Sequence, residues 1–359
     1  MTDHARHFSG TKAVAAAHQF DVGALSTWLC AQLGNTFQIT AVEQFKGGQS
    51  NPTFKIITSE KTLVMRAKPA PAAKLLASAH AIEREYAVMK ALAGTAVPVP
   101  KTLALCTDEA VIGRAFFIME MIEGRIMWNA AMPDAEPGER TVVFNEMNRV
   151  IAALHQVDYV RIGLAEFGKP GNYFERQIGR WTKQYRAAET TPIEAMDNLI
   201  AWLPKHIPPG EETAIVHGDF RMDNLVFHPT EARILAVLDW ELSTLGHPLA
   251  DFAYHAMAWQ VGPEVFRGVA GLDLAALGIP SLETYIADYC TRTGRDGIDN
   301  IDYYLAYNLF RMTGILQGVA KRAADGTAAS EQAVAMGRAA RPLAELGWRF
   351  AEKVMQKNN

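Results

Sequence analysis

Two short apolar segments, AIVHGD at 214–219 and ILAVLDW at 234–240, interrupt a long stretch of sequence that otherwise reads as helices. Apolar runs of this length predict buried strands. Each segment carries an aspartate at or near its end, Asp219 in the first and Asp239 in the second, so both carboxylates are expected where a strand leaves the core. The residues between them read as a hairpin that would bring Asp239 back beside Asn224.

The rest of the sequence changes character once, near Gly124. Before it, strand-like stretches dominate, and two segments with apolar residues at three- and four-residue spacing predict helices. The expected strands lie near 37–46, 54–58, 62–67, 101–106 and 115–122, and the expected helices at 21–34 and 74–93. After it, helices are expected at 139–156, 172–188, 194–203, 249–260, 283–293, 301–322 and 328–356.

A sheet with one long helix, followed by a mainly helical part, predicts an α+β fold. The chain has 359 residues, which is long for one hydrophobic core and suits two lobes. The N-terminal lobe is expected to span 1–121 and the C-terminal lobe 122–359.

Charge and cysteine content argue against several classes of protein. The 35 basic and 39 acidic residues give a net charge of −4, so no general affinity for nucleic acid or an anionic membrane is expected. Cys30, Cys106 and Cys290 form no CxxC pair, which argues against a disulfide framework or a cysteine zinc site and favours the cytoplasm. The N-terminal residues lack the apolar core of a secretory signal, and no apolar run approaches the roughly 18 residues of a membrane span.

The octapeptide HGDFRMDN at 217–224 carries the strongest chemical signal. Phosphoryl transfer needs a carboxylate beside the attacking hydroxyl and oxygen ligands for a metal ion. Asp219 and Asn224 can fill both needs within one loop, and Asp239 would add the anionic ligand that a hard cation such as Mg²⁺ prefers. A lone HGD tripeptide would mean little, but the octapeptide followed by Asp239 at a strand end is specific.

The pattern His-x-Asp-x-x-x-x-Asn, followed by a strand and an aspartate, resembles the catalytic loop of the protein-kinase superfamily. The HGD form, with Trp240 after Asp239, is closer to the aminoglycoside phosphotransferase and choline kinase branch. The runs FKGGQSNPTF, REYAVMKAL, VPVPK, HGDFRMDNL and VLDWELSTLGHPLADFAY closely resemble the kinase-like N-terminal domain of acyl-CoA dehydrogenase family members ten and eleven and its free-standing bacterial relatives. The resemblance extends from about Phe45 to about Arg322 and implies a protein-kinase-like two-lobed fold that uses ATP and Mg²⁺.

The resemblance assigns catalytic and metal-binding roles. Asp219 corresponds to the carboxylate that accepts or aligns the proton of the attacking hydroxyl. Arg221 stands where many kinases have a lysine that touches the transferred phosphate, and His217 resembles the structural histidine of the loop. Asn224 and Asp239 correspond to the Mg²⁺ ligands.

The same resemblance assigns nucleotide-binding residues to the N-terminal lobe. Glu85 resembles the helix glutamate that orders a phosphate-binding cation, here Arg66. A loop whose backbone N–H groups can cradle phosphates is formed by Gly47, Gly48, Gln49 and Ser50. The hinge that would hold adenine through its backbone is formed by Glu120, Met121 and Ile122.

Three features depart from the family pattern. Arg66 replaces the expected strand lysine; its planar fork suits phosphate, but Lys68 would point the same way, so which of the two reaches ATP stays open. The phosphate loop is not GxGxxG. Trp240 and Glu241 follow Asp239 in place of Phe-Gly, which removes the switch of regulated protein kinases and argues against a protein substrate. Both residues also have a purely structural interpretation: Arg66 could be an exposed cation on a strand, and Glu85 could be a surface carboxylate on a helix.

The segment 172–188 is a candidate surface for an anionic acceptor. Its basic face, which would also suit simple solvation, is formed by Arg176, Arg180 and Lys183. Tyrosines and an arginine on a later helix could line the same site or belong to the core. The candidate substrate residues are Arg176, Arg180, Tyr307 and Arg311.

The sequence therefore predicts a kinase that transfers the γ-phosphate of ATP to the hydroxyl of a small molecule. The resemblance favours a hydroxyacyl-CoA or a related hydroxy acid over an antibiotic as acceptor. One alternative is a catalytically silent nucleotide-binding scaffold, which Arg66 and the unusual phosphate loop suggest. Another is a flavin-dependent acyl-CoA dehydrogenase, but the relatives carry that chemistry in a separate later domain, so no dehydrogenase activity is expected. The acceptor, the oligomeric state and any regulation stay open.

Overall fold

A computed structural model describes residues 9–34, 38–46, 51–69, 81–325 and 337–357 of the chain. The chain forms two compact units, each built from several stretches of sequence. The first unit comprises 1–128, 160–167 and 222–243, and the second comprises 129–159, 168–221 and 244–359. The lobes expected from the sequence are two consecutive stretches, so they differ from these units at 160–167 and 222–243; the lobe boundary after residue 121 stays a prediction.

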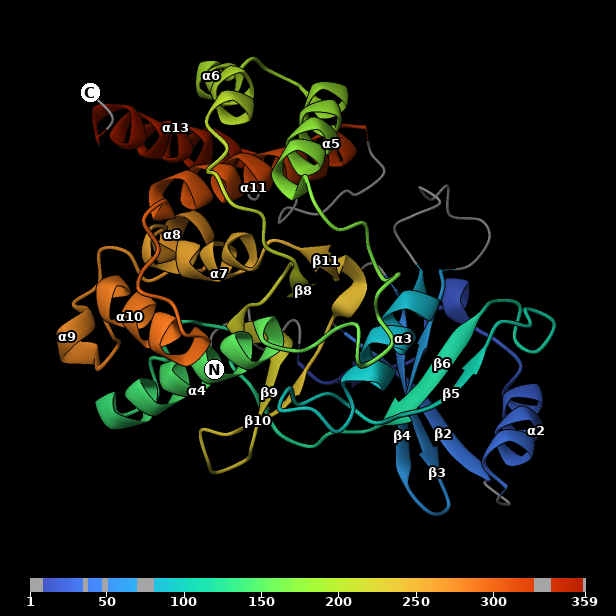
Figure 1. Ribbon diagram of the computed structural model, residues 1–359. Helices are drawn as coiled ribbons and strands as arrows, with labels where there is room; N and C mark the ends of the chain where they lie inside the picture. Colours follow the sequence, from blue (N-terminus) through green and yellow to red (C-terminus); the bar gives the residue numbers. More distant parts are fainter. Residues whose placement is uncertain (1–8, 35–37, 47–50, 70–80, 326–336, 358–359) are drawn as a thin grey trace. The chain divides into compact units, whose positions relative to one another are not determined.

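A six-stranded antiparallel sheet forms the framework of the first unit (Figure 1). Its strand order is β1-β2-β3-β4-β6-β5. The strands are β1 (Thr11–Lys12), β2 (Ile39–Phe45), β3 (Thr53–Thr58), β4 (Thr62–Ala67), β5 (Thr102–Cys106) and β6 (Phe116–Glu120). The unit also holds α2 (Val22–Leu33), α3 (Ile82–Leu92) and the 3₁₀ turn Ala16–His18. The predicted helix at 74–93 is described only from residue 81 onward, where α3 spans Ile82–Leu92.

The two helices of the first unit contact opposite faces of this sheet. Successive side chains of a strand alternate between faces. Along β4, Met65 and Ala67 join Leu25 and Leu29 of α2 in one apolar core. Arg66 therefore points to the other face, where α3 lies against β5 and β6. This alternation explains how a buried arginine can lie near the end of a mainly apolar strand.

A second, three-stranded sheet completes the first unit, with order β10-β9-β7. β7 (Arg125–Ile126), β9 (Leu225–Phe227) and β10 (Ile234–Val237) pair antiparallel. The hairpin predicted between Asn224 and Asp239 is therefore present, with Val237 opposite Leu225. Short 3₁₀ turns flank it at Met222–Asn224 and Trp240–Leu242.

The second unit is mainly helical, as predicted. Its helices are α4 (Pro137–His155), α5 (Tyr173–Ala188), α6 (Glu194–Trp202), α7 (Pro248–Ala256), α8 (Pro263–Phe266), α9 (Leu274–Leu277), α10 (Leu282–Thr293), α11 (Ile301–Ala324) and α13 (Ala340–Lys357), with 3₁₀ turns at Leu203–Lys205 and Met257–Trp259. α11 is central to it: it packs against α5, α7 and α13 (Figure 1). A two-stranded sheet of β8 (Ala214–Val216) and β11 (Thr244–Gly246) lies in the same unit. In the described part of the chain, no helix has the length and apolar character needed to cross a membrane.

Candidate active site

Arg66 and Glu85 form a buried ion pair in the first unit. Arg66 Nε lies 2.6 Å from Glu85 Oε2, and Asn51 Nδ2 donates to Glu85 Oε1 at 2.8 Å. Arg66 is 9 % exposed and Glu85 1 % exposed, so neither is a surface residue. Burial raises the pKa of the Glu85 carboxyl, whereas the charge of Arg66 and the hydrogen bond from Asn51 act to lower it. The helix carboxylate and the strand cation that the sequence singled out thus contact each other directly.

Arg66 also binds two carboxylates that follow the β9–β10 hairpin. Its Nη2 lies 2.6 Å from Asp239 Oδ1 and 3.5 Å from Glu241 Oε2. Burial alone would lower the pKa of Arg66, but these carboxylates and Glu85 raise it above its ordinary value. One guanidinium therefore faces three carboxylates. The excess of negative charge gives this cluster an electrostatic reason to bind a cation.

The hairpin brings Asn224 and Asp239 to adjacent backbone positions. The N–H of Leu238 donates to the carbonyl of Asn224 at 2.8 Å. Asp239 adopts a left-handed conformation with φ 66° and ψ 61°, which costs energy in a non-glycine residue and marks a position fixed by its surroundings. The amide oxygen and the carboxylate are oxygen donors of the kind that Mg²⁺ prefers, so the residues fit this ion.

The structure says less about the other residues that were predicted to bind the nucleotide. Lys68 pairs with Glu83 at 2.5 Å and is part-exposed, so of the two strand cations only Arg66 joins the carboxylate cluster. Glu120 ends β6, with its N–H bonded to the carbonyl of Lys101 at 3.0 Å. The remaining hinge residues, Met121 and Ile122, are half-exposed. The predicted phosphate loop of Gly47, Gly48, Gln49 and Ser50 lies outside the described residues.

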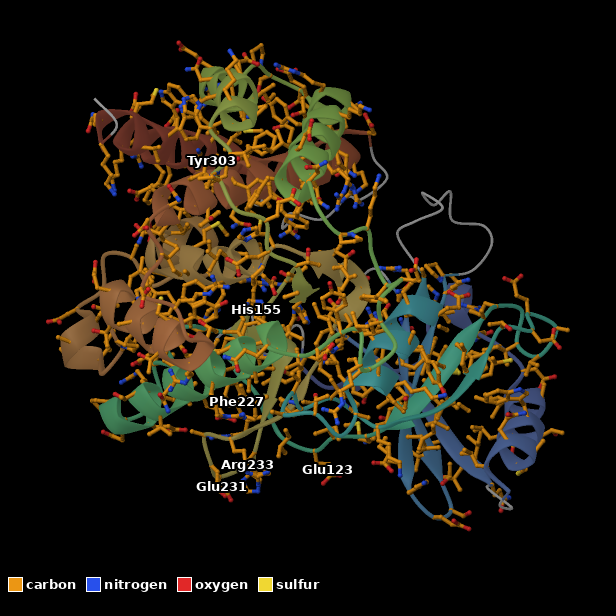
Figure 2. All side chains as sticks on the ribbon, in the orientation of Figure 1. Glu123, His155, Phe227, Glu231, Arg233 and Tyr303 are labelled. Atoms are coloured by element: carbon orange, nitrogen blue, oxygen red, sulfur yellow. The ribbon has the colours of Figure 1, made fainter. Side chains whose placement is uncertain are left out.

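The loop that follows β8 in the second unit is held by Asp251. Its Oδ2 accepts the N–H of His217 at 2.7 Å, and its Oδ1 accepts the N–H of Gly218 at 2.8 Å. His155, labelled in Figure 2, contacts Oδ2 through Nε2 at 3.2 Å. Gly218 has φ 82°, a conformation that glycine adopts without a Cβ clash. The left-handed glycine and the buried carboxylate of Asp251 therefore fix the backbone conformation of the loop before Asp219.

Replacing Asp251 by asparagine is expected to lower the free energy of unfolding by about 2–4 kcal/mol at pH 7, because an amide cannot accept three donors and its NH₂ would face an N–H group. Burial alone would raise the pKa of Asp251, but the bonds from His155 and His217 lower it. A lowered pKa stabilises the folded state above the unfolded pKa of about 4, and this contribution is lost as the pH falls through the folded pKa. Urea unfolding of the variant and the unchanged chain should therefore converge toward low pH. Asp296→Asn, at an exposed aspartate, is the control, and a pH-independent difference would contradict this account.

Asp219 receives donors from Arg221 and Tyr254. Arg221 Nε lies 2.8 Å from Oδ1, and Arg221 Nη2 lies 3.2 Å from Oδ2. Tyr254 Oη donates to Oδ1 at 2.5 Å. Burial alone would raise the pKa of Asp219, but the charge of Arg221 and the bond from Tyr254 lower it below the ordinary value. At neutral pH the group is a carboxylate.

Two second-unit contacts were missed by the sequence analysis. Tyr254 was not singled out, although it follows Asp251 by three residues on α7 and so shares a helix face with it. Arg311 was a substrate candidate, but its Nη2 donates to the carbonyl of Gly218 at 2.6 Å. Its guanidinium carbon lies 5.0 Å from the ring centre of Tyr254 and 5.5 Å from that of Trp181.

The other substrate candidates lie on α5 and α11. Tyr307 is 1 % exposed, and burial raises its pKa far above the ordinary value. Arg176 is half-buried and donates to the carbonyl of Lys169 at 2.5 Å. Arg180 is exposed, with its guanidinium 5.7 Å from the ring of Trp181. Of these two candidate arginines of α5, one is therefore tethered and the other faces solvent.

Known proteins resemble this chain in sequence. Residues 41–296 match the phosphotransferase enzyme family (APH). Acyl-CoA dehydrogenase family member 10 of Mus musculus is 49% identical over 312 residues, which cover 86% of this chain but 29% of that protein. Proteins named acyl-CoA dehydrogenase family member 11 match as well, and the chain again spans less than half of their length. The resemblance stated from the motifs is confirmed.

Solved structures agree with this family. A crystal structure from Ralstonia eutropha, described provisionally as an aminoglycoside phosphotransferase, has a TM-score of 0.86 at 58% identity and covers 93% of this chain and 99% of that one. An APH(4)-Ia mutant in complex with ADP and hygromycin B has a TM-score of 0.58 at 16% identity, covers 90% and 99%, and shows the fold alone. The predicted kinase-like two-lobed α+β fold is confirmed. With its match over residues 41–296, the chain belongs to the phosphotransferase enzyme family.

Proposed function

We propose that this chain transfers the γ-phosphoryl group of Mg·ATP to a hydroxyl group of a small molecule. The observation that carries the proposal is the buried cluster in which Arg66 joins Glu85 and Asp239. A phosphate-binding cation ordered by a helix glutamate, next to an anionic metal ligand, is what phosphoryl transfer by a kinase requires. The ADP complex of a phosphotransferase with the same fold supports a nucleotide as the donor.

In the first unit, Arg66 would bind a phosphate oxygen of the nucleotide while Glu85 keeps its fork oriented. Asn224 and Asp239 would hold Mg²⁺, which neutralises charge on the phosphates when bound. Arg66 now contacts Asp239 at 2.6 Å. Because a carboxylate that turns to a metal ion no longer needs a guanidinium partner, metal and nucleotide binding would release Arg66 for the phosphates.

In the second unit, Asp219 would align the acceptor's hydroxyl and take its proton. The hydroxyl oxygen forms a bond to the γ-phosphorus as the bond from that phosphorus to the β,γ-bridging oxygen breaks, and ADP leaves with the electron pair. Arg221 would contact the transferred phosphoryl group. The lowered pKa of Asp219 makes it a weak base, so alignment of the hydroxyl is its larger contribution.

The charges of the second unit favour an anionic acceptor. Arg180 and Lys183 are exposed on α5 and, among the described residues, neither forms an ion pair. Arg311 is 6 % exposed and is likewise without an ion pair in the described part of the chain. Cationic groups of this kind would attract the phosphates of CoA or a carboxylate and would repel a polycationic aminoglycoside. We therefore propose a hydroxyacyl-CoA or a hydroxy acid as acceptor, with Arg176, Tyr307 and Arg311 as further substrate residues.

A 4-hydroxyacyl-CoA is expected to be phosphorylated far faster than kanamycin at matched concentration, because only the thioester carries charge complementary to α5. ADP release in the presence of Mg·ATP measures both reactions. Arg180→Glu combined with Lys183→Glu should raise KM for the thioester about tenfold, whereas Lys353→Glu, at an exposed lysine of α13, should not. Robust turnover of kanamycin without response to any hydroxyacyl-CoA or hydroxy acid would refute the acceptor assignment and leave the phosphotransferase assignment intact.

The same assays address the two alternatives. A silent scaffold would bind Mg·ATP and release no ADP with any hydroxyl acceptor. The curated relative is named as a dehydrogenase, but this chain covers 29% of its length, and we expect no dehydrogenase activity from it. A protein with bound flavin would absorb visible light, whereas a kinase of this family without flavin is colourless.

A further inference from the structure

The carboxylate of Asp219 has a second donor to which the family resemblance gives no role. Tyr254 Oη donates to Oδ1 at 2.5 Å, the same oxygen that Arg221 Nε approaches at 2.8 Å. Two short bonds to one carboxylate oxygen fix the plane and direction of the group. Asp219 is therefore oriented before any acceptor is bound.

Tyr254 is itself positioned by its helix, α7, and by a contact of its ring with Arg311. α7 places Asp251 and Tyr254 on one helix face, so the same helix holds the backbone of the catalytic loop and its carboxylate. The guanidinium of Arg311 lies against the Tyr254 ring, 5.0 Å from its centre, and binds the carbonyl of Gly218 at 2.6 Å. The cation–π contact and the hydrogen bond connect the ring to the loop that carries Asp219.

We propose that Tyr254 is a positioning residue for phosphoryl transfer, which keeps Asp219 directed at the acceptor's hydroxyl when Arg221 turns to the transferred phosphoryl group. The inference rests on the proposed function. A single arginine cannot hold the resting carboxylate and also stabilise the charge on the phosphoryl group in the transition state. Tyr254 suits the first task because it is neutral: burial and the nearby Asp219 raise its pKa far above the ordinary value, so the phenol keeps its proton.

The pKa of Asp219 is set by burial and by the charged and hydrogen-bonding groups that face its carboxyl within the second unit. They are Arg221 and His217 on its own loop, Tyr254 on α7 and Arg311 on α11. Burial opposes ionisation of Asp219, while Arg221, Tyr254 and His217 favour it. Removal of the Tyr254 hydroxyl therefore raises the pKa of Asp219 and also frees the carboxylate to rotate.

Tyr254→Phe tests this role because it keeps the ring and its contact with Arg311. We expect kcat to fall about tenfold to a hundredfold with KM for ATP changed by less than about twofold. The acidic limb of kcat/KM should move up by about one pH unit. The matched control is Tyr303→Phe, which removes a buried hydroxyl that donates to the carbonyl of Leu203 at 3.1 Å in the same unit (Figure 2). Its kinetics and pH limb should match those of the unchanged chain.

A second measurement does not depend on turnover. In a chain with ¹³C-labelled aspartate, the side-chain carboxyl resonance of Asp219 is identified by its absence from Asp219→Asn. Its titration midpoint should rise by about one pH unit in Tyr254→Phe and stay unchanged in Tyr303→Phe. An unchanged midpoint in Tyr254→Phe, or equal losses of kcat in both variants, overturns the inference. If the unchanged chain phosphorylates no hydroxyl acceptor, the proposed function fails, and the inference of a positioning role in that reaction falls with it, while the midpoint still reports whether Tyr254 controls Asp219.

Discussion

Replacing Asp219 by asparagine is expected to lower turnover about a thousandfold or more while Mg·ATP affinity stays within about twofold of the unchanged chain. The amide is nearly isosteric and still offers an oxygen to Tyr254, which donates to Oδ1 at 2.5 Å. It cannot accept the hydroxyl proton, and its NH₂ would face Arg221. Nucleotide binding is assigned to other residues, so the loss should lie in kcat.

Steady-state ADP release gives kcat, and calorimetric titration with a non-hydrolysable ATP analogue gives affinity. Asp296→Asn, at an exposed aspartate of the second unit, removes the same charge elsewhere and should leave both quantities unchanged. Turnover in Asp219→Asn close to that of the control would refute the catalytic assignment. A parallel loss of thermal stability would instead assign Asp219 a structural role.

Replacing Asp239 by alanine is expected to weaken Mg·ATP binding roughly a hundredfold, and Asn224→Ala should weaken it less, because a charged ligand contributes more to a hard cation than a neutral amide does. The contact of Asp239 with Arg66 at 2.6 Å adds a sharper expectation. Without Mg²⁺, the variant should bind ATP at least as tightly as the unchanged chain, since Arg66 loses a competing partner and the cluster loses a negative charge. A general loss of folding would weaken binding under both conditions.

Calorimetry with ATP measures whether Asp239→Ala weakens ATP binding in the presence of Mg²⁺ and leaves it equal or stronger in its absence. The matched control is Glu231→Ala, which removes an exposed carboxylate from the turn of the same hairpin (Figure 2). It should bind Mg·ATP like the unchanged chain. Unchanged Mg·ATP affinity in Asp239→Ala would show that the hairpin does not carry the metal site, and the kinase assignment of this segment would fall with it.

Local patterns were sufficient to predict several parts of the candidate site. The β9–β10 hairpin has a short connection and apolar strands, so the return of Asp239 to Asn224 could be predicted from the sequence, whereas the register shift between Ile234 and Ala236 was not. The resemblance assigned Arg66 to Glu85 as its cation, and burial of the carboxylate at 1 % exposure makes such a partner necessary. In both cases the two residues that are brought together lie within about twenty residues of each other in the sequence.

Contacts between distant segments were not predictable in this way. Arg66 and Asp239 are 173 residues apart, and Arg311 and Gly218 are 93 apart. No periodicity encodes such a pairing, since it depends on how whole helices and sheets pack. β11 (Thr244–Gly246) was missed because three residues are too few to show alternation, and it forms only because β8 offers a partner.

The discontinuous first unit bears on how the chain folds. Its hairpin at 222–243 pairs with β7 through β9, and Val237 donates to the carbonyl of Pro98. During synthesis the N-terminal sheet must therefore wait for more than a hundred further residues before this unit can be completed. Contacts of such high sequence separation slow folding. Until the hairpin arrives, Arg66 has only Glu85 of its three carboxylate partners, so a nascent chain that stops before residue 239 carries a charge-balanced ion pair without the excess negative charge that would attract a cation.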